Sequence, residues 1–257
     1  MAEVAKGFVW YELMTTDVAA AEAFYRAVVG WEAEEAGGPG RPYRVMRAGE
    51  ARVAGLMPLP EDARAGGLPP VWVGYIGTAD VDAEAEAVAR AGGAVHRAPA
   101  DIPGIGRFAV VTDPQGALFT LFTPRGEVPA PVPAGTPGHV GWHELYAADW
   151  PAAFAFYAER FGWTKAESID LGPMGTYQLF AAGGVPVGGM MNKFPSQPTP
   201  SWQFYINVVE IEAAAARVRE AGGTVLMEPH QVPGGSWILQ GRDPQGAAFA
   251  LVAAPRA

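Results

Sequence analysis

Short apolar stretches alternate along this chain with Ala-rich helical stretches in a fixed order. The pattern predicts a strand from Gly7 to Met14, followed by Asp17 as the N-cap of a helix that Gly30 ends. The remaining elements of the first half are expected to be short strands at 43–47, 51–57, 72–77, 106–111 and 117–122 and a helix at 81–91. The first half therefore predicts two β-α-β-β-β units.

The second half of the chain carries the same pattern again. Trp10-Tyr11-Glu12-Leu13 returns 132 residues later (10 to 142) as Trp142-His143-Glu144-Leu145. Four further motifs return at offsets of 132 or 130, namely Phe24-Tyr25, Gly30-Trp31, Ala91-Gly92-Gly93 and Asp113-Pro114-Gln115-Gly116. The second copy predicts strands at 140–146, near Tyr177 and Val187, at 202–207 and near Trp237 and Phe249, with helices at 151–160 and 211–221. We therefore expect an α+β fold of two tandem domains, 1–127 and 139–257, joined by the Pro-rich linker 128–138.

Composition narrows the classes of partner. A chain of 257 residues has room for two domains of about 125 residues each. The net charge of -9 and the lack of a basic run argue against nucleic acid, because an acidic protein repels phosphate. No cysteine is present, which removes thiolate nucleophiles, zinc–thiolate sites and disulfides. The sequence has no secretory signal pattern and no apolar run of membrane-spanning length, so we expect a cytoplasmic protein without a membrane partner.

These motifs together resemble the vicinal oxygen chelate superfamily, which holds glyoxalases, extradiol dioxygenases and fosfomycin and bleomycin resistance proteins. The Trp-x-Glu-Leu opening, present twice, resembles its tandem glyoxalase-like subgroup. The resemblance covers nearly the whole chain and implies that the two units of each domain form a cup-shaped mixed sheet. Because this fold hosts many chemistries, the activity has to be inferred from the residues of the site.

In metal-using members, the resemblance implies three ligand positions around each cup. They hold Trp10, Val73 and Thr120 in the first half and Trp142, Gln203 and Ala250 in the second. A catalytic divalent ion normally takes about three oxygen, nitrogen or sulfur ligands from the protein, and these residues do not supply them. We therefore expect that both metal sites are lost and that no cofactor is bound. An unusual set of His143, Glu144 and Gln203 remains open as the alternative.

Strand alternation predicts the side chains that line the cups instead. Glu12 and Glu144 are expected to face the cups, whereas His143 is expected to pack on the other face. The ligand-contacting side chains are expected to be Trp10, Tyr43, Tyr75, Trp142, Tyr146, Tyr177, Gln203 and Tyr205. Gly55 and Gly189 also match between the halves. An apolar pocket with a few polar groups is the usual form of a small-molecule site.

The two glutamates allow two interpretations. A carboxylate in an aromatic cup needs a cation or hydrogen-bond donors, or its pKa rises through desolvation, which suits a catalytic acid or base. Alternatively, each glutamate is structural and binds the backbone or an arginine such as Arg107. The tryptophans Trp10 and Trp142 likewise either stack on a flat ligand or fill the space of a lost metal.

Four functions follow from these observations. The first is metal-independent binding of a small aromatic or hydrophobic molecule. The second is a metal-free enzyme with Glu12 or Glu144 as the catalytic acid or base. The third is a metal-dependent lyase, isomerase or dioxygenase, and the fourth is an interaction protein with empty cups. A homodimer is possible in each case, because related proteins pair their units within or between chains.

Overall fold

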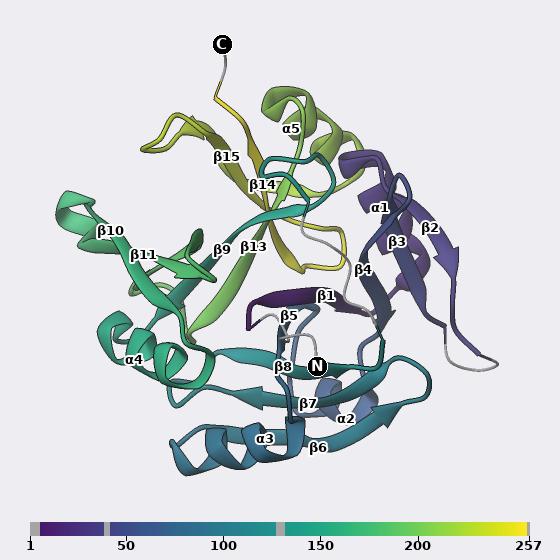
Figure 1. Cartoon of the computed structure of the whole chain (residues 1–257). Coiled ribbons are helices and arrows are strands. Elements are labelled where there is room, and N and C mark those ends of the chain that lie inside the picture. Colours follow the sequence, from purple (N-terminus) through teal and green to yellow (C-terminus); the bar gives the residue numbers. More distant parts are fainter. Residues whose placement is uncertain (1–5, 39–41, 127–131, 256–257) are drawn as a thin grey trace. The chain divides into compact units, whose positions relative to one another are not determined.

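Helices and strands follow one another in the same order in both halves of the chain (Figure 1). The computed structural model describes residues 6–38, 42–126 and 132–255. The first half contains β1 (Phe8–Thr15), α1 (Val18–Val29), β2 (Glu32–Glu35), β3 (Arg44–Ala48), β4 (Ala51–Pro58), α2 (Glu61–Ala65), β5 (Val71–Gly77), α3 (Val81–Arg90), β6 (Ala94–Ile102), β7 (Gly106–Thr112) and β8 (Leu118–Pro124). The second half contains β9 (Val140–Ala147), α4 (Trp150–Phe161), β10 (Thr164–Asp170), the 3-10 turn η1 (Gly172–Met174), β11 (Thr176–Ala182), β12 (Val185–Asn192), β13 (Ser201–Asn207), α5 (Ile211–Glu220), β14 (Thr224–Gln231), β15 (Trp237–Arg242) and β16 (Ala248–Ala253). Each half therefore carries the predicted β-α-β-β-β order twice, and the α+β class is confirmed.

Each half contributes one eight-stranded mixed sheet. The strand order is β2-β3-β4-β1-β5-β8-β7-β6 in the first half and β10-β11-β12-β9-β13-β16-β15-β14 in the second. In the first half β1 runs parallel to β4 and β5 runs parallel to β8, while the outer strands pair antiparallel. Two modules of four strands joined in this way form the predicted cup-type sheet.

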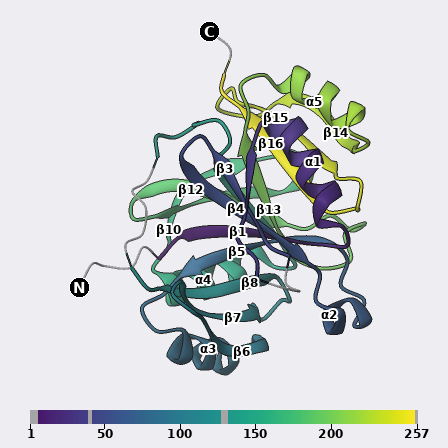
Figure 2. The ribbon, with the colours of Figure 1, turned by 90° about the vertical axis from the view of Figure 1, so that its right-hand side faces the viewer.

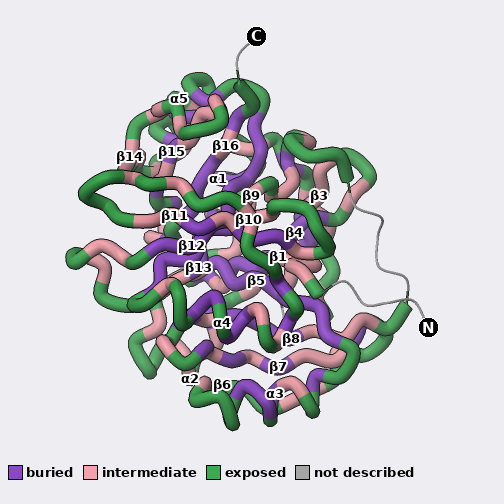
Figure 3. Tube along the Cα trace, turned by 60° about the vertical axis from the view of Figure 1, so that its left-hand side comes forward, coloured by how far each residue is buried: buried purple, intermediate pink, exposed green. Residues whose placement is uncertain are grey.

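The sequence interpretation missed the outermost strands of both sheets, which are β2, β6, β10 and β14. Their residues are mostly exposed or half-buried, as the tube in Figure 3 shows for β6. An exposed edge strand lacks the apolar alternation of a half-buried one and forms by backbone pairing with its single neighbour. The short helix α2 was also missed, inside the long loop expected before β5. None of the helices in the described residues is long and apolar enough to span a membrane.

Close contacts group the modules across the two halves. Unit 1 consists of the described residues of Met1–Val9, Val73–Pro131 and His143–Trp202. Unit 2 consists of those of Trp10–Trp72, Val132–Trp142 and Gln203–Ala257. Each unit thus joins one module of the first half to one module of the second. The predicted linker 128–138 lies partly outside the described residues, which resume at 132.

Helices from opposite halves pack together inside each unit. In unit 2, α1 and α5 lie side by side (Figures 1 and 2). The Arg217 guanidinium of α5 donates two hydrogen bonds to the Val28 carbonyl of α1, at 2.9 and 3.0 Å. In unit 1, α3 contacts α4 in the equivalent way. The apolar face of each helix is therefore buried by both halves of the sequence.

A buried Trp–Tyr–Asp chain joins the repeated motifs of unit 1. The Trp202 indole donates to the Tyr157 hydroxyl at 3.0 Å, and that hydroxyl donates to Asp113 at 3.2 Å. The other Asp113 oxygen accepts the backbone N–H groups of Gln115 and Ala117, both at 2.9 Å. Burial raises the pKa of Asp113, and these donors partly offset the rise. The tyrosine of the Phe-Tyr motif in one half therefore donates a hydrogen bond to the aspartate of the Asp-Pro-Gln-Gly turn in the other half.

Unit 2 contains the same chain of hydrogen bonds with the halves exchanged. The Trp72 indole donates to the Tyr25 hydroxyl at 2.8 Å, and Tyr25 donates to Asp243 at 3.2 Å. The Gly-Trp motifs also act across the halves, because the Trp31 indole donates to the Gly138 carbonyl and the Trp163 indole donates to the Lys6 carbonyl. The Phe-Tyr, Gly-Trp and Asp-Pro-Gln-Gly motifs are thus explained by these hydrogen bonds between the halves.

Replacing Tyr157 by Phe should lower the free energy of unfolding by about 2 kcal/mol. The substitution leaves the Trp202 N–H and one Asp113 oxygen buried without their partner, and a hydrogen bond to a charged group is worth about that amount. Urea unfolding measures the change. Tyr25→Phe removes the twin contact in unit 2 and should cost a similar amount; a loss below about 0.5 kcal/mol in both variants would contradict the account.

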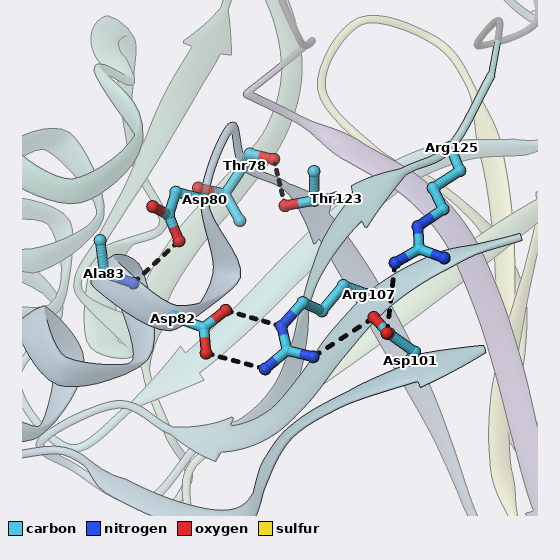
Figure 4. A network of polar contacts seen from close by, with 8 residues as sticks. All are labelled: Thr78, Asp80, Asp82, Ala83, Asp101, Arg107, Thr123 and Arg125. Carbon is cyan, nitrogen blue, oxygen red and sulfur yellow. Dashed lines mark hydrogen bonds and ion pairs between the residues drawn. The ribbon is translucent and has the colours of Figure 1, made fainter. Parts of the chain in front are cut away.

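Arg107 does not bind either glutamate, contrary to the alternative raised from the sequence. Figure 4 shows its guanidinium held between α3 and β6. It donates to both Asp82 carboxylate oxygens, at 2.6 and 2.8 Å, and to Asp101 at 3.2 Å. Arg125 pairs with the same Asp101, at 3.2 Å. All four side chains are partly exposed, so we expect the network to contribute little to stability.

Candidate functional site

The helix-free face of each sheet carries the side chains that the sequence singled out. Phe249 of β16 packs against Phe24 of α1, with ring centroids 5.5 Å apart, so its neighbour Ala250 lies on the opposite face. In unit 1, Phe119 of β8 packs against Tyr157 of α4 at 5.7 Å, which places Thr120 on the opposite face. We call these the helix-free faces.

On the helix-free face of unit 2, Trp10, Tyr43 and Glu12 form a chain of hydrogen bonds. The Trp10 indole donates to the Tyr43 hydroxyl, and Tyr43 donates to the Glu12 carboxylate. Burial, followed by the negative charge of Glu12, raises the pKa of Tyr43, so its hydroxyl stays protonated and remains a donor. Glu12 is only 6% exposed, while Trp10 and Tyr43 are half-buried. The buried carboxylate thus has a phenol as its donor.

Gly55 makes this arrangement possible. It lies opposite Glu12 on the parallel strand β4, and a Cβ at Gly55 would collide with the Tyr43 hydroxyl and come within 3.1 Å of the Glu12 carboxylate. The tyrosine ring end therefore lies directly over the backbone of β4, which only glycine allows.

The second half repeats the geometry in unit 1. Gly189 of β12 lies opposite Glu144 of β9. A Cβ at Gly189 would collide with the Tyr177 ring. Glu144 is 8% exposed, and Tyr177 is half-buried. Beyond Glu144 on the same strand, Tyr146 contacts Phe194 at 5.8 Å in the loop that precedes β13. Trp142, two residues before Glu144, belongs to unit 2 and is half-buried.

The second modules differ between the halves. In unit 2, the Gln240 amide donates to the Tyr205 hydroxyl at 2.7 Å across Ala250, which pairs with both residues. In unit 1, Tyr75 and Thr120 pair in the same way, but Val110 takes the place of Gln240. The helix-free face in unit 2 is therefore the more polar one.

Tyr75 contacts another aromatic ring. Phe122 lies against it with ring centroids 5.8 Å apart. Gln203, two residues before Tyr205, is half-buried on the polar face of unit 2. The sequence analysis missed Gln240 and Phe122. The offset of 130 (110 to 240) would have shown that a glutamine in the second half matches Val110 in the first.

His143 is packed away from Glu144, as strand alternation predicts. Its ring stacks on Phe8 with centroids 4.4 Å apart, and its Nδ1–H donates to the Val187 carbonyl at 2.6 Å. Burial lowers the pKa of His143 to about 4, so the ring is neutral near pH 7. Because neighbouring residues on a strand point to opposite faces, His143 and Glu144 cannot bind one metal ion together. The alternative ligand set with Gln203 is therefore wrong.

The ligand positions implied by the resemblance hold few donor atoms. Trp10 and Trp142 offer an indole, and Val73, only 2% exposed, offers no donor atom. Within residues 6–38, 42–126 and 132–255, no group of three or more His, Cys, Asp or Glu side chains could hold a metal ion. The donor set at these positions does not fit a catalytic divalent ion.

Comparison with known proteins places the chain in a family. The Glyoxalase/Bleomycin resistance protein/Dioxygenase superfamily matches twice, at residues 7–121 and 136–251. The chain belongs to this superfamily. Among curated proteins it is 34% identical to CFP32 of Mycobacterium tuberculosis, provisionally named a glyoxylase, over 95% of this chain and 93% of that protein. It is 33% identical to the anthracycline biosynthesis protein DnrV of Streptomyces peucetius, over 95% of this chain and 91% of that protein.

Solved structures of this superfamily share the fold. The Mn(II)-bound glyoxalase of Novosphingobium aromaticivorans superposes with a TM-score of 0.66 at 18% identity, covering 98% of this chain and 83% of that one. The 2,2',3-trihydroxybiphenyl 1,2-dioxygenase of Sphingomonas wittichii gives 0.67 at 16% identity, covering 98% and 91%. At such low identity the similarity establishes the fold and leaves the chemistry to the residues described above.

Proposed function

We propose that this superfamily member binds a small, flat aromatic molecule on its helix-free faces and does so without a metal ion. The observation that carries the proposal is the Trp10–Tyr43–Glu12 chain of hydrogen bonds, which occupies the first of the implied ligand positions. Indole and phenol groups supply flat, polarizable surfaces, and the carboxylate fixes their orientation.

Two further observations support this ligand class. The repeated pair of Gly189 and Tyr177 brings a second tyrosine ring close to the backbone of β12, the strand paired with that of Glu144. The relative DnrV is named as an anthracycline biosynthesis protein, and anthracyclines contain a planar anthraquinone ring system. A planar ligand of that class would stack on an indole with most of its area buried.

Replacing Trp10 or Trp142 by Leu should weaken binding of a planar probe about tenfold. Loss of ring stacking removes roughly 0.5–1.5 kcal/mol, and about 1.4 kcal/mol corresponds to a factor of ten. We would titrate 1,8-dihydroxyanthraquinone into the protein by isothermal calorimetry. Trp150→Leu is the matched control, because that half-buried indole lies at the start of α4 beside Lys165. Equal binding by all variants, or no binding by the unaltered protein, would rule out the proposal.

A metal-free enzyme is the second candidate. A protonated phenol that donates to a buried carboxylate, as Tyr43 does to Glu12, is a pair through which a proton can move. In the second half the corresponding carboxylate is Glu144. If the protein is an enzyme, the unaltered chain should convert the anthraquinone probe into a product of different mass. Glu144→Gln should abolish that conversion while the melting temperature barely changes. A probe recovered unchanged from the unaltered protein favours binding alone, and a large stability loss with unaltered binding favours a structural glutamate.

A further inference from the structure

Two glutamines of unit 2 occupy positions where unit 1 has valines. Gln203 matches Val73 and Gln240 matches Val110, both at an offset of 130 (73 to 203 and 110 to 240). Gln203 lies on β13 and Gln240 on β15, and β16 runs between these two strands. Both side chains are on the helix-free face, because they share the alternation of Tyr205 and Ala250. We call this surface of β13, β16 and β15 the glutamine face.

Gln240 is partly exposed on the glutamine face, so a ligand can reach it. It is half-buried, whereas Tyr205 is only 2% exposed and Ala250 is fully buried. The Gln240 amide donates to the Tyr205 hydroxyl at 2.7 Å. The buried tyrosine therefore holds the amide in a fixed position, and a ligand that binds to the amide avoids most of the entropic cost of ordering it.

The duplicated copy shows that a buried tyrosine at this position does not require a glutamine beside it. Tyr75, 7% exposed, takes the place of Tyr205, and Val110 takes the place of Gln240. Val110 is half-buried, as Gln240 is, so the two positions are similarly exposed and differ in their chemistry. Thr120, which lies between Tyr75 and Val110, is only 1% exposed and offers a ligand little surface. A ligand on unit 1 therefore meets an apolar side chain where a ligand on unit 2 meets an amide.

We propose that Gln240 makes the glutamine face selective for aromatic ligands that carry a hydroxyl group, while the matching face of unit 1 has no such preference. This inference rests on the proposed binding of flat aromatic molecules and names the class that one face prefers. The ligand hydroxyl would donate to the Gln240 amide oxygen, which can accept two hydrogen bonds. A bare aromatic edge would displace water from that amide without replacing its hydrogen bond, and a hydroxyl beside Val110 would lose its own hydrogen bond to water.

The test uses three probes that share one ring system, namely naphthalene, 2-naphthol and 2-methoxynaphthalene. Each is titrated into the full-length protein and followed by NMR. The backbone amide of Ala250 reports on the glutamine face, and that of Thr120 reports on the matching face of unit 1. At Ala250, 2-naphthol should bind about fivefold more tightly than 2-methoxynaphthalene, which cannot donate a hydrogen bond, because one neutral hydrogen bond contributes about that factor. At Thr120, 2-naphthol should have no such advantage.

The first half of the chain provides the main variant. Gln240→Val copies Val110 and should bind 2-naphthol about fivefold more weakly at Ala250, while naphthalene should bind at least as tightly as before. Tyr205→Phe removes the hydroxyl that positions the Gln240 amide, so it should reduce the preference for 2-naphthol over 2-methoxynaphthalene without weakening naphthalene. The control is Gln231→Val, at an exposed glutamine on β14 of the same unit, which should bind all three probes as the unaltered protein does.

The outcomes separate this inference from the proposed function. Saturable binding of naphthalene, with equal affinities for 2-naphthol and 2-methoxynaphthalene at Ala250, would overturn the selectivity and leave the aromatic site in place. A preference for 2-naphthol that survives Gln240→Val would also overturn it, because another group would then accept the hydrogen bond. If none of the three probes gave a saturable shift at either amide, the proposed aromatic site itself would be wrong and the selectivity with it.

Discussion

Gly188→Ala should lower the free energy of unfolding by at least about 3 kcal/mol, the upper end of the usual range for an overpacked core. A Cβ at Gly188 would collide with the His143 backbone oxygen on the neighbouring strand β9 and would lie 2.5 Å from the buried Phe180 ring. Neither group can move easily, because the oxygen belongs to the sheet and Phe180 is fully buried. The pairing of β12 with β9 should therefore weaken. Urea unfolding followed by circular dichroism measures the loss.

The matched control for that substitution is Gly38→Ala. A Cβ at Gly38 meets no atom within 4 Å, and its backbone does not adopt a positive φ. The free energy of unfolding of the Gly38→Ala variant should differ from that of the unaltered protein by less than about 0.5 kcal/mol, as is usual for surface substitutions. If Gly188→Ala lowered the free energy of unfolding as little as Gly38→Ala does, the close approach of β9 and β12 would be wrong.

Acidification from pH 6.5 to about 4 should cost the protein about 3 kcal/mol through His143 alone. Burial lowers the pKa of this ring from 6.5 to about 4, and each pKa unit is worth about 1.4 kcal/mol. Because the folded-state pKa is depressed, the stabilising contribution is complete above pH 6.5 and is lost as the pH falls toward 4. The imidazole is only 7% exposed, so solvent screening does not reduce the effect greatly.

The effect is measured as a difference between variants, because carboxylates also titrate in this range. His143→Tyr copies Tyr11, the residue at the matching position of the first half. Its unfolding free energy should fall between pH 6.5 and 4 by about 3 kcal/mol less than that of the unaltered protein. If the unfolding free energies of His143→Tyr and of the unaltered protein changed with pH in parallel, the buried His143 ring would not control the loss of stability between pH 6.5 and 4.

The candidate site was only partly predictable from the sequence. Alternation on the second opening strand placed Glu144 and His143 on opposite faces, because side-chain direction on a strand has a strict period of two. The partner of Glu12 could not be read in this way. Tyr43 reaches it only because Gly55, on a strand paired parallel to β1, lacks a side chain. Gln240 was missed because its contact with Tyr205 depends on the register of three strands.

The sequence by itself determined the duplication, the four modules, and the ends of the main helices. Those features depend on local physics, such as the Asp17 cap that accepts the Ala20 N–H and the left-handed Gly30 that ends α1. Only the tertiary structure decided which copy of the Phe-Tyr motif binds which copy of the Asp-Pro-Gln-Gly motif. Tyr25 of the first half binds Asp243 of the second, since burying the helix faces pairs modules across the repeat. The two copies of a motif are identical in sequence, so no local pattern can distinguish a partner within one half from a partner in the other.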